Sequence, residues 1–190
     1  MTLFFTSDTH FGHANIIRLS NRPFGAVEDM NERIVENWNR VVGADDVVYH
    51  LGDAVMGKFE DNVSYLGRLN GKKFLVPGNH DRVFSQEKPA RRERFRAFYE
   101  ENGFEVVEEM TYGVIGGHRF ILCHFPFEGD SHDGDRFENL RPARGLGMPV
   151  VHGHVHEKWR INGDQFNVGV DVNDFTPVHE DVIEAWLNTL

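Results

Sequence analysis

The chain has 190 residues, and its 20 Lys and Arg against 30 Asp and Glu give a formal net charge of −10 at pH 7. This acidity argues against a large nucleic-acid-binding surface, although bound divalent cations would reverse the field locally. The single cysteine, Cys123, excludes an internal disulfide and fits a reducing compartment. No apolar run approaches the ~20 residues of a membrane span. We therefore expect one cytoplasmic domain over residues 1–190.

Residues 2–6 are typical of a buried strand, and residues 7–13 follow it with the sequence Ser-Asp-Thr-His-Phe-Gly-His. Asp8 and His10 are two positions apart, so both face one side if the strand continues. A carboxylate and an imidazole placed in this way can share one metal ion. His13 stands at the start of a short predicted helix over residues 15–19. It is either a further site residue or a solvated helix terminus.

The next elements are a helix over residues 27–42 and a strand over residues 46–51. Apolar residues recur every three or four positions in the helix, which indicates an amphipathic helix packed on the core. The strand contains His50, which we interpret as a hydrogen-bonded core histidine. It closes with Gly52 and Asp53, where the glycine allows the backbone to approach a ligand closely.

A helix over residues 59–69 precedes a strand over residues 73–76 that Pro77 and Gly78 interrupt. Asn79 and His80 then lie on a tight loop at the carboxyl end of this strand. Open α/β sheets place their reactive groups at such ends.

The helix predicted over residues 86–103 carries four closely spaced arginines. They suggest either a phosphate-binding surface or a solvated face paired with the glutamates of the same helix, and the solvated face is favoured. The arginines are Arg91, Arg92, Arg94 and Arg96, and the glutamates are Glu93, Glu100 and Glu101.

Strands are predicted over residues 104–107, 112–115 and 120–123, with a Gly-Gly hairpin turn before the last of them, which ends in His124. Residues 128–147 form a long irregular loop that we interpret as functional. Its Arg136, Arg141 and Arg144 are candidates for holding a substrate phosphate, since arginine binds phosphate oxygens bidentately. Surface solvation is the equal alternative.

A strand over residues 149–151 leads into three histidines at a spacing of two, namely His152, His154 and His156. They share one face if the strand continues. Residues 165–170 are expected to pair with this strand, and residues 182–187 form a short C-terminal helix.

The motifs Asp-x-His, Gly-Asp, Gly-Asn-His-Asp, His and Gly-His-x-His occur in this order between Asp8 and His156. This order resembles that of the calcineurin-like metallophosphoesterase superfamily, and most closely its small bacterial and phage-type members. The resemblance implies an α/β fold that is a four-layer αββα sandwich, with two mixed β-sheets flanked by helices.

The resemblance also implies a role for each motif residue. One divalent metal ion would be bound by Asp8, His10 and His156. A second would be bound by Asn79, His124 and His154. Asp53 would bridge the two ions, and His80 would be the catalytic histidine rather than a ligand.

The chemistry of these residue types agrees with a dinuclear centre. Two cations held ~3.5–4 Å apart act as a clamp for in-line displacement at phosphorus and lower the pKa of a bound water. Mixed histidine, carboxylate and amide ligands suit Mn²⁺, with Fe, Zn, Ni or Co as alternatives, better than they suit Ca²⁺. His80 can protonate the leaving oxygen or stabilise charge on the phosphoryl group.

Ligand histidines need further partners, because each uses its second ring nitrogen for a hydrogen bond. The candidates are Asp171, Asn167 and His152. Asp81 either orients His80 or fixes its loop.

We thus predict a metal-dependent phosphodiesterase that acts by in-line attack of a metal-bridging hydroxide. A phosphomonoesterase is the alternative within the same site, and a non-catalytic metal-binding scaffold is the alternative from another class. The expected partner is a phosphate-ester substrate, such as a nucleotide or a nucleic-acid end. His13, Arg136 and Arg144 would lie on its side of the site.

Overall fold

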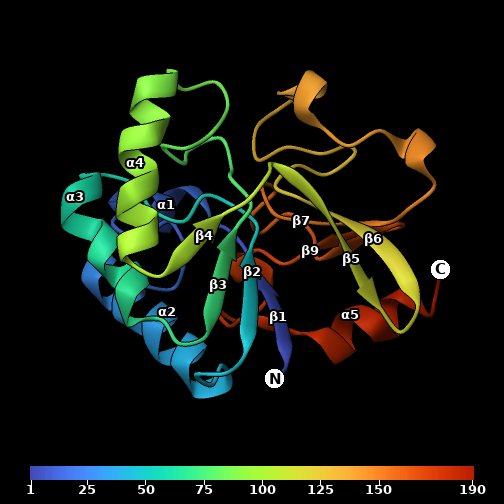
Figure 1. Cartoon of the computed structure of the whole chain (residues 1–190), viewed down its shortest axis with the longest axis horizontal. Helices are drawn as coiled ribbons and strands as arrows, with labels where there is room; N and C mark the ends of the chain where they lie inside the picture. The colour runs from blue at the N-terminus through green and yellow to red at the C-terminus, as the bar shows by residue number, and fades with distance from the viewer.

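The computed structural model describes residues 1–190 and contains two five-stranded β-sheets that pack against each other (Figure 1). The first sheet has the strand order β10-β1-β2-β3-β4. Its strands are β10 (Val178–His179), β1 (Leu3–Thr6), β2 (Val47–His50), β3 (Lys72–Leu75) and β4 (Phe104–Val106). β1 to β4 are parallel and β10 is antiparallel to β1, so the sheet is mixed.

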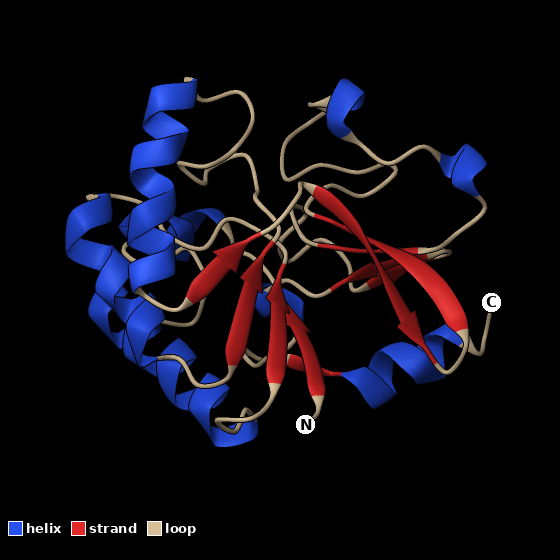
Figure 2. Ribbon diagram, in the orientation of Figure 1, coloured by secondary structure: helices blue, strands red, loops and turns tan.

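Helices cover the outer face of the first sheet (Figure 2). They are α1 (Ala14–Leu19), α2 (Val27–Val41), α3 (Phe59–Asn62), the 3-10 helix η1 (Val63–Arg68) and α4 (Pro89–Glu101). The apolar stripe of α2 buries Met30, Ile34 and Trp38 in a cluster of 21 core residues. The stripe predicted from the sequence therefore packs on the core, because this burial removes its apolar area from water.

The second sheet has the order β5-β6-β7-β9-β8 and is also mixed. Its strands are β5 (Met110–Ile115), β6 (His118–Cys123), β7 (Val150–His152), β9 (Gln165–Asn167) and β8 (Ile161–Asn162). Its outer face carries a small apolar cluster with Phe84, Ile121 and Phe125. The covering segment contains only the short 3-10 helices η2 (Glu138–Leu140) and η3 (Arg144–Leu146).

The C-terminal helix α5 (Glu180–Leu187) contributes to the apolar layer between the two sheets. Ile183 and Trp186 pack there in one cluster with Phe5 and Phe120, which come from β1 and β6. The prediction of two mixed sheets flanked by helices is confirmed. None of the helices combines the length and the apolar character needed to cross a membrane.

Three details differ from the sequence-based expectations. The helix predicted over residues 59–69 is divided into α3 and η1, and the strand predicted over residues 165–170 ends at Asn167, before the 3-10 helix η4 (Val170–Val172). The strands β8 and β10 were not predicted. Each has only two residues, which is too short to show a period of two.

The parallel strands bring the motifs together. β1, β2 and β3 run in one direction, and their carboxyl ends lead into the loops of Asp8, Asp53 and Asn79. In the second sheet, β6 and β7 are parallel and lead into His124 and His154. An isolated bridge between Ser7 and Gly169 joins the two sheets at this edge.

Candidate metal centre

The loops that carry the predicted ligands have a strained backbone. β1 and β7 end before their motifs, so the condition under which an extended strand would align these side chains is not met. A left-handed conformation orients them instead, with positive φ at Asp8 (58°), His10 (49°), Asp53 (59°), His154 (71°) and His156 (50°). Such residues cost about 1–3 kcal/mol each and concentrate at functional sites.

Two glycines allow the loops to approach each other. A Cβ atom on Gly52 would collide with the backbone of Gly78 and lie 2.8 Å from Nδ1 of His124. A Cβ atom on Gly153 would collide with the carboxylate of Asp8. Each glycine directly precedes a predicted ligand, so the absent side chain is what permits the ligands to converge.

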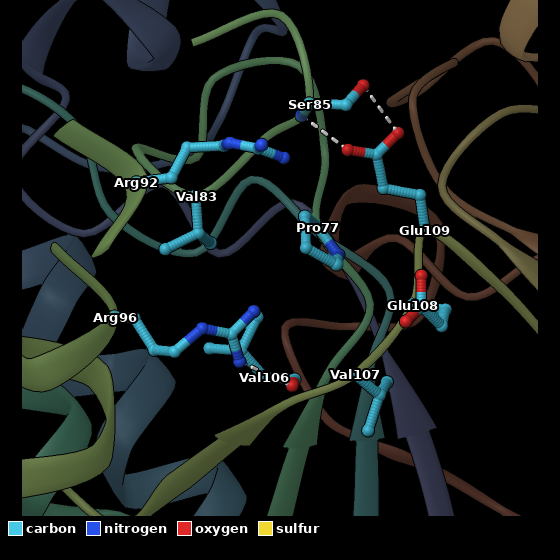
Figure 3. Close-up of a pocket in the computed structure, with 9 residues that line it drawn as sticks. All are labelled: Pro77, Val83, Ser85, Arg92, Arg96, Val106, Val107, Glu108 and Glu109. Carbon is cyan, nitrogen blue, oxygen red and sulfur yellow. Dashed lines mark hydrogen bonds between the residues drawn. The ribbon is translucent and has the colours of Figure 1, made fainter. Parts of the chain in front are cut away.

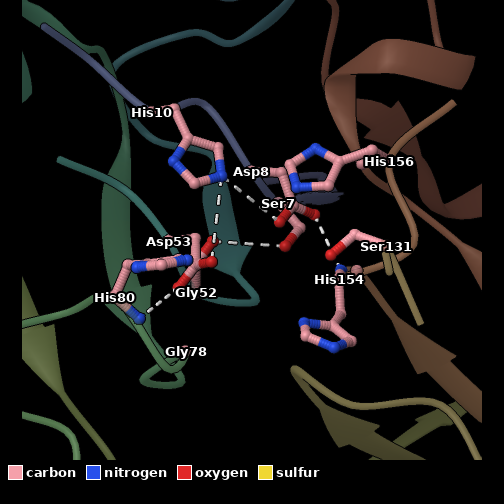
Figure 4. A network of polar contacts seen from close by, with 12 residues as sticks. Ser7, Asp8, His10, Gly52, Asp53, Gly78, His80, Ser131, His154 and His156 are labelled. Atoms are coloured by element: carbon pink, nitrogen blue, oxygen red, sulfur yellow. Dashed lines mark hydrogen bonds and ion pairs between the residues drawn. The ribbon is translucent and has the colours of Figure 1, made fainter. Parts of the chain in front are cut away.

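The first group of candidate ligands consists of Asp8, His10 and His156, which are buried and have ligand atoms within 4.8 Å of one another (Figure 4). Oδ1 of Asp8 and both ring nitrogens of His10 are buried without a hydrogen-bond partner. Native proteins rarely leave buried polar atoms unsatisfied, and a bound ion is one of the established reasons. The donor set therefore fits a divalent metal ion.

The second group surrounds Nε2 of His124. This atom lies 3.2 Å from Oδ1 of Asn79, 3.2 Å from Nδ1 of His154 and 3.5 Å from Oδ2 of Asp53. The same carboxylate oxygen of Asp53 is 3.8 Å from Nε2 of His10. Asp53 thus stands between the two groups.

The outer ring nitrogens of three histidines are fixed by hydrogen-bond partners. Nδ1 of His124 lies 2.7 Å from the carbonyl oxygen of Leu51, and Nδ1 of His156 lies 3.1 Å from Oδ2 of Asp171. Nε2 of His154 lies 3.0 Å from a carboxylate oxygen of Asp130. These contacts select the tautomer that directs the other nitrogen inward, as metal-binding histidines require.

Of the three predicted partners, only Asp171 contacts a ligand imidazole. Asn167 donates to the carbonyl oxygens of His156 and Trp159 at 2.9 and 2.8 Å, so it fixes the loop rather than the ring. Nδ1 of His152 contacts the carbonyl oxygen of Gly153 at 2.7 Å. Burial lowers the pKa of His152 to about 3, which keeps this core imidazole neutral.

Asp130 is a site residue that the sequence reasoning missed. Its carboxylate is buried and contacts the imidazole of His154. The same carboxylate accepts hydrogen bonds from the Arg136 side chain at 2.7 Å, the Arg141 side chain at 3.3 Å and the backbone N–H of His132 at 3.0 Å. The sequence indicates that the irregular loop is functional, but the loop has no periodicity that could single out one of its aspartates.

Asp81 fixes the loop rather than orienting the catalytic candidate. Its Oδ2 accepts from the backbone N–H groups of Asp53 at 2.7 Å and Gly78 at 2.8 Å, and its Oδ1 accepts from the Tyr99 hydroxyl at 2.9 Å. No hydrogen bond joins Asp81 to the imidazole of His80.

Burial keeps two of the ligand imidazoles neutral. Burial lowers the pKa of His10 well below its usual value and that of His154 to about 4. Burial also lowers the pKa of His156, but Asp8 and Asp171 outweigh it and raise the pKa. A neutral imidazole has the free lone pair that a metal ion needs.

His80 differs from the ligands in its exposure. Its side chain is exposed, whereas most of the ligand candidates are buried, and its backbone N–H donates to Oδ1 of Asp53 at 2.8 Å (Figure 4). The ring centre lies 5.8 Å from that of His10, and the half-buried ring of His13 lies 5.3 Å from the same His10 ring. Both histidines thus border the first group of ligands.

Arg136 and Arg144 both form ion pairs with carboxylates. Arg136 donates through Nε and a terminal nitrogen to Asp130. Arg144 forms exposed ion pairs with Asp164 at 2.8 Å and Glu128 at 3.0 Å. Contact of either arginine with a substrate stays a prediction.

His50 is a core histidine, as expected from its place within a strand. It is fully buried in β2, and its Nε2 lies 2.9 Å from the Thr9 hydroxyl. Burial lowers its pKa to about 3.

Two stacked mixed sheets, with histidine, carboxylate and amide groups converging at the strand ends, define a metal-dependent phosphoesterase. The sequence matches the family Calcineurin-like phosphoesterase over residues 1–159, and the chain belongs to this family. It is 35% identical to the uncharacterized protein MJ1445 of Methanocaldococcus jannaschii, over 95% of this chain and 88% of that protein. It is 32% identical to the Gene 66 protein of Mycobacterium phage L5, over 88% of this chain and 85% of the phage protein. The crystal structure of AQ665 from Aquifex aeolicus, a protein of unknown function, aligns with a TM-score of 0.73 at 26% identity and covers 97% of this chain and 98% of that one.

Proposed function

We propose that this protein hydrolyses phosphodiesters at a centre of two divalent cations. The observation that carries the proposal is the position of Asp53, whose Oδ2 lies 3.8 Å from Nε2 of His10 and 3.5 Å from Nε2 of His124. A carboxylate between two imidazole groups suits a pair of cations, because its charge partly neutralises both.

Each ion would have its own ligands in addition to Asp53. Asp8, His10 and His156 would hold the first, and Asn79, His124 and His154 the second. Once bound, the two cations supply Lewis-acid activation of a water molecule and of the phosphoryl oxygens. Mn²⁺ is our proposal for the resident metal, since mixed nitrogen and oxygen donors suit borderline ions.

His80 would act on the leaving group. Its exposed imidazole borders the ligand groups, and its backbone is fixed by the hydrogen bond to Asp53. From there the imidazolium can deliver a proton to the departing oxygen, while the ring of His13 bounds the same side of the site.

The ion pairs that the loop arginines already form favour a diester substrate over a monoester substrate. A monoester has more negative charge on its phosphoryl group and would gain more from additional cationic contacts. Arg136 and Arg144 would supply such contacts, but both already pair with carboxylates. We further propose a small substrate, such as a nucleotide or a nucleic-acid end, because the net charge of −10 disfavours a long duplex.

The test compares two chromogenic esters on protein that has been stripped of metal and reloaded with Mn²⁺. We expect metal-dependent cleavage of bis-p-nitrophenyl phosphate to exceed that of p-nitrophenyl phosphate, with two metal ions per chain by elemental analysis. A preference for the monoester would replace the proposal with a phosphomonoesterase. One ion per chain would overturn the dinuclear centre. Two ions without cleavage of either ester would favour the scaffold alternative.

A further inference from the structure

The four arginines of α4 do not form one uniform surface. Arg91 pairs with Glu87 at 3.4 Å and Arg94 pairs with Glu60 at 3.3 Å, so both have carboxylate partners at the surface. These acceptors are not the glutamates of α4 that the sequence suggested, but the solvated interpretation holds for this half of the set.

The other two arginines, Arg92 and Arg96, have no carboxylate partner within ion-pair distance. Arg96 donates to the carbonyl oxygen of Val106 at 2.9 Å, whereas Nε of Arg92 is buried and has no hydrogen-bond partner. The two are four positions apart on one helix, where like charges destabilise each other. A buried guanidinium nitrogen without an acceptor is also unfavourable.

Both side chains line a cavity of about 320 Å³ (Figure 3). The cavity lies between α4, the loop after β3 and the segment that connects β4 to β5. In Figure 3 Arg92 extends from α4 toward Pro77 and Arg96 extends toward Val106, with Glu108 and Glu109 on the opposite side of the cavity. A smaller cavity of about 240 Å³ adjoins it and is lined by the same two arginines.

The two glutamates opposite the arginines have different surroundings. The carboxylate of Glu109 accepts from the backbone N–H and from the hydroxyl of Ser85, so it is already engaged. Glu108 has no hydrogen-bonded side-chain partner in the structure and faces the same space. The cavity therefore presents two guanidinium groups without a carboxylate partner on one wall and one carboxylate without a hydrogen-bond partner on the other.

We propose that this cavity is a binding site for a small phosphorylated molecule, separate from the metal centre, with Arg92 and Arg96 holding the phosphate group. Guanidinium groups match phosphate oxygens in geometry and in charge, and an anion would relieve the repulsion between the two arginines. Glu108 would accept from a hydroxyl or amino group of the same molecule. The volume is at the small end of ligand pockets, which fits a molecule of this size.

The test follows the side-chain Nε–H signals of arginine by ¹H–¹⁵N NMR, on full-length protein with Mg²⁺ present, during titration with inorganic phosphate and with glycerol phosphate. We expect the signals of Arg92 and Arg96 to shift and to saturate. The double variant Arg92→Gln/Arg96→Gln, followed by the backbone amide signals of the lining residues Ser85, Val107 and Glu108, should bind phosphate at this site at least tenfold more weakly. Its metal-dependent turnover should be unchanged.

The matched control is Arg91→Gln/Arg94→Gln, which removes the same charge from the same helix. This control should keep the binding, because its arginines are paired with Glu87 and Glu60. An equal loss in both double variants would show that only the general charge of α4 matters and would overturn the proposal. Phosphate that shifts only signals of the metal centre would overturn it as well. Neither result would depend on whether the enzyme prefers diesters.

Discussion

A carboxylate oxygen of Asp130 lies 3.0 Å from Nε2 of His154, so the long irregular loop is joined to the candidate metal centre through one buried contact. Both oxygens of Asp130 accept hydrogen bonds, Oδ1 from His132 and Arg136 and Oδ2 from the Arg136 backbone. The carboxylate thus orients a ligand imidazole and also orders the loop around it.

The variant Asp130→Asn should bind metal about 10–100-fold more weakly, because either orientation of the amide sets its NH₂ group against a donor. The measurement is competition with a chromophoric chelator. Asp135→Asn is the control, since Asp135 is in the same loop and contacts only the backbone N–H of Gly129. Equal affinities of Asp130→Asn and the unsubstituted protein would contradict this role.

The variant His80→Ala should lose activity without losing metal. His80 is exposed and contributes no ligand atom to either group, so its removal leaves the donors in place. The turnover number for the diester should fall about 10²–10⁴-fold, the usual contribution of a general acid. Metal content by elemental analysis is measured in parallel. Turnover that persists while metal stays bound would show that the assigned role is wrong.

The variant Gly153→Ala should be destabilised and should also bind metal more weakly. The added methyl group meets the side chains of Ser7 and Asp8, neither of which has room to move. Overpacking of this kind costs about 1–3 kcal/mol, measurable by urea denaturation. Gly145→Ala is the control, because no atom lies within 4 Å of the added methyl group. Similar stabilities of the two variants would refute the steric explanation.

The buried ion pair between Arg22 and Asp171 should contribute far more to the free energy of unfolding than the exposed ion pair between Arg68 and Glu32. Arg22 is buried and donates to both carboxylate oxygens of Asp171, at 2.7 and 2.9 Å. Removal of one partner of a buried pair costs about 3–5 kcal/mol, so Arg22→Met should lower the free energy of unfolding by this amount.

The exposed comparison is Arg68→Met, which breaks an equally bidentate pair with Glu32. Exposed pairs contribute about 0–1 kcal/mol. Urea denaturation of both variants measures the difference, and equal losses would mean that burial does not govern the contribution of Arg22.

Asp46 should make the stability depend on pH. Its carboxylate accepts from the backbone N–H of Gly43 and that of Thr2, and these bonds hold its pKa below its usual value. A lowered pKa in the folded state stabilises the fold above the unfolded-state pKa, and this contribution is lost as the pH falls through the folded-state value.

Asp46→Asn should therefore lower the urea midpoint at pH 7 and have a smaller effect near pH 3, when metal-free protein is used throughout. Asp45→Asn serves as the control, as Asp45 is the neighbouring exposed aspartate and has no such bonds. If Asp46→Asn lowers the urea midpoint by the same amount at both pH values, the carboxylate charge is excluded as the cause.

The sequence by itself determined the order of the main elements and the identity of the seven candidate ligands. Strands such as β1 and β3 are short apolar runs and the helix α2 has a clear hydrophobic period, and both are local properties that the chain itself displays. The motifs could be identified because each follows the carboxyl end of a predicted strand. The resemblance to the family then supplied their roles.

Only the tertiary structure decided how these residues meet. Asp8 and His156 are directed inward by left-handed backbone, which local pattern does not encode and which the surrounding contacts must hold in place. The role of Asp130 depends on contacts between segments that are distant in the sequence. The division of the arginines of α4 into paired and unpaired sets likewise depends on which carboxylates the fold brings within reach, because a hydrogen bond or ion pair forms between neighbours in space rather than in sequence.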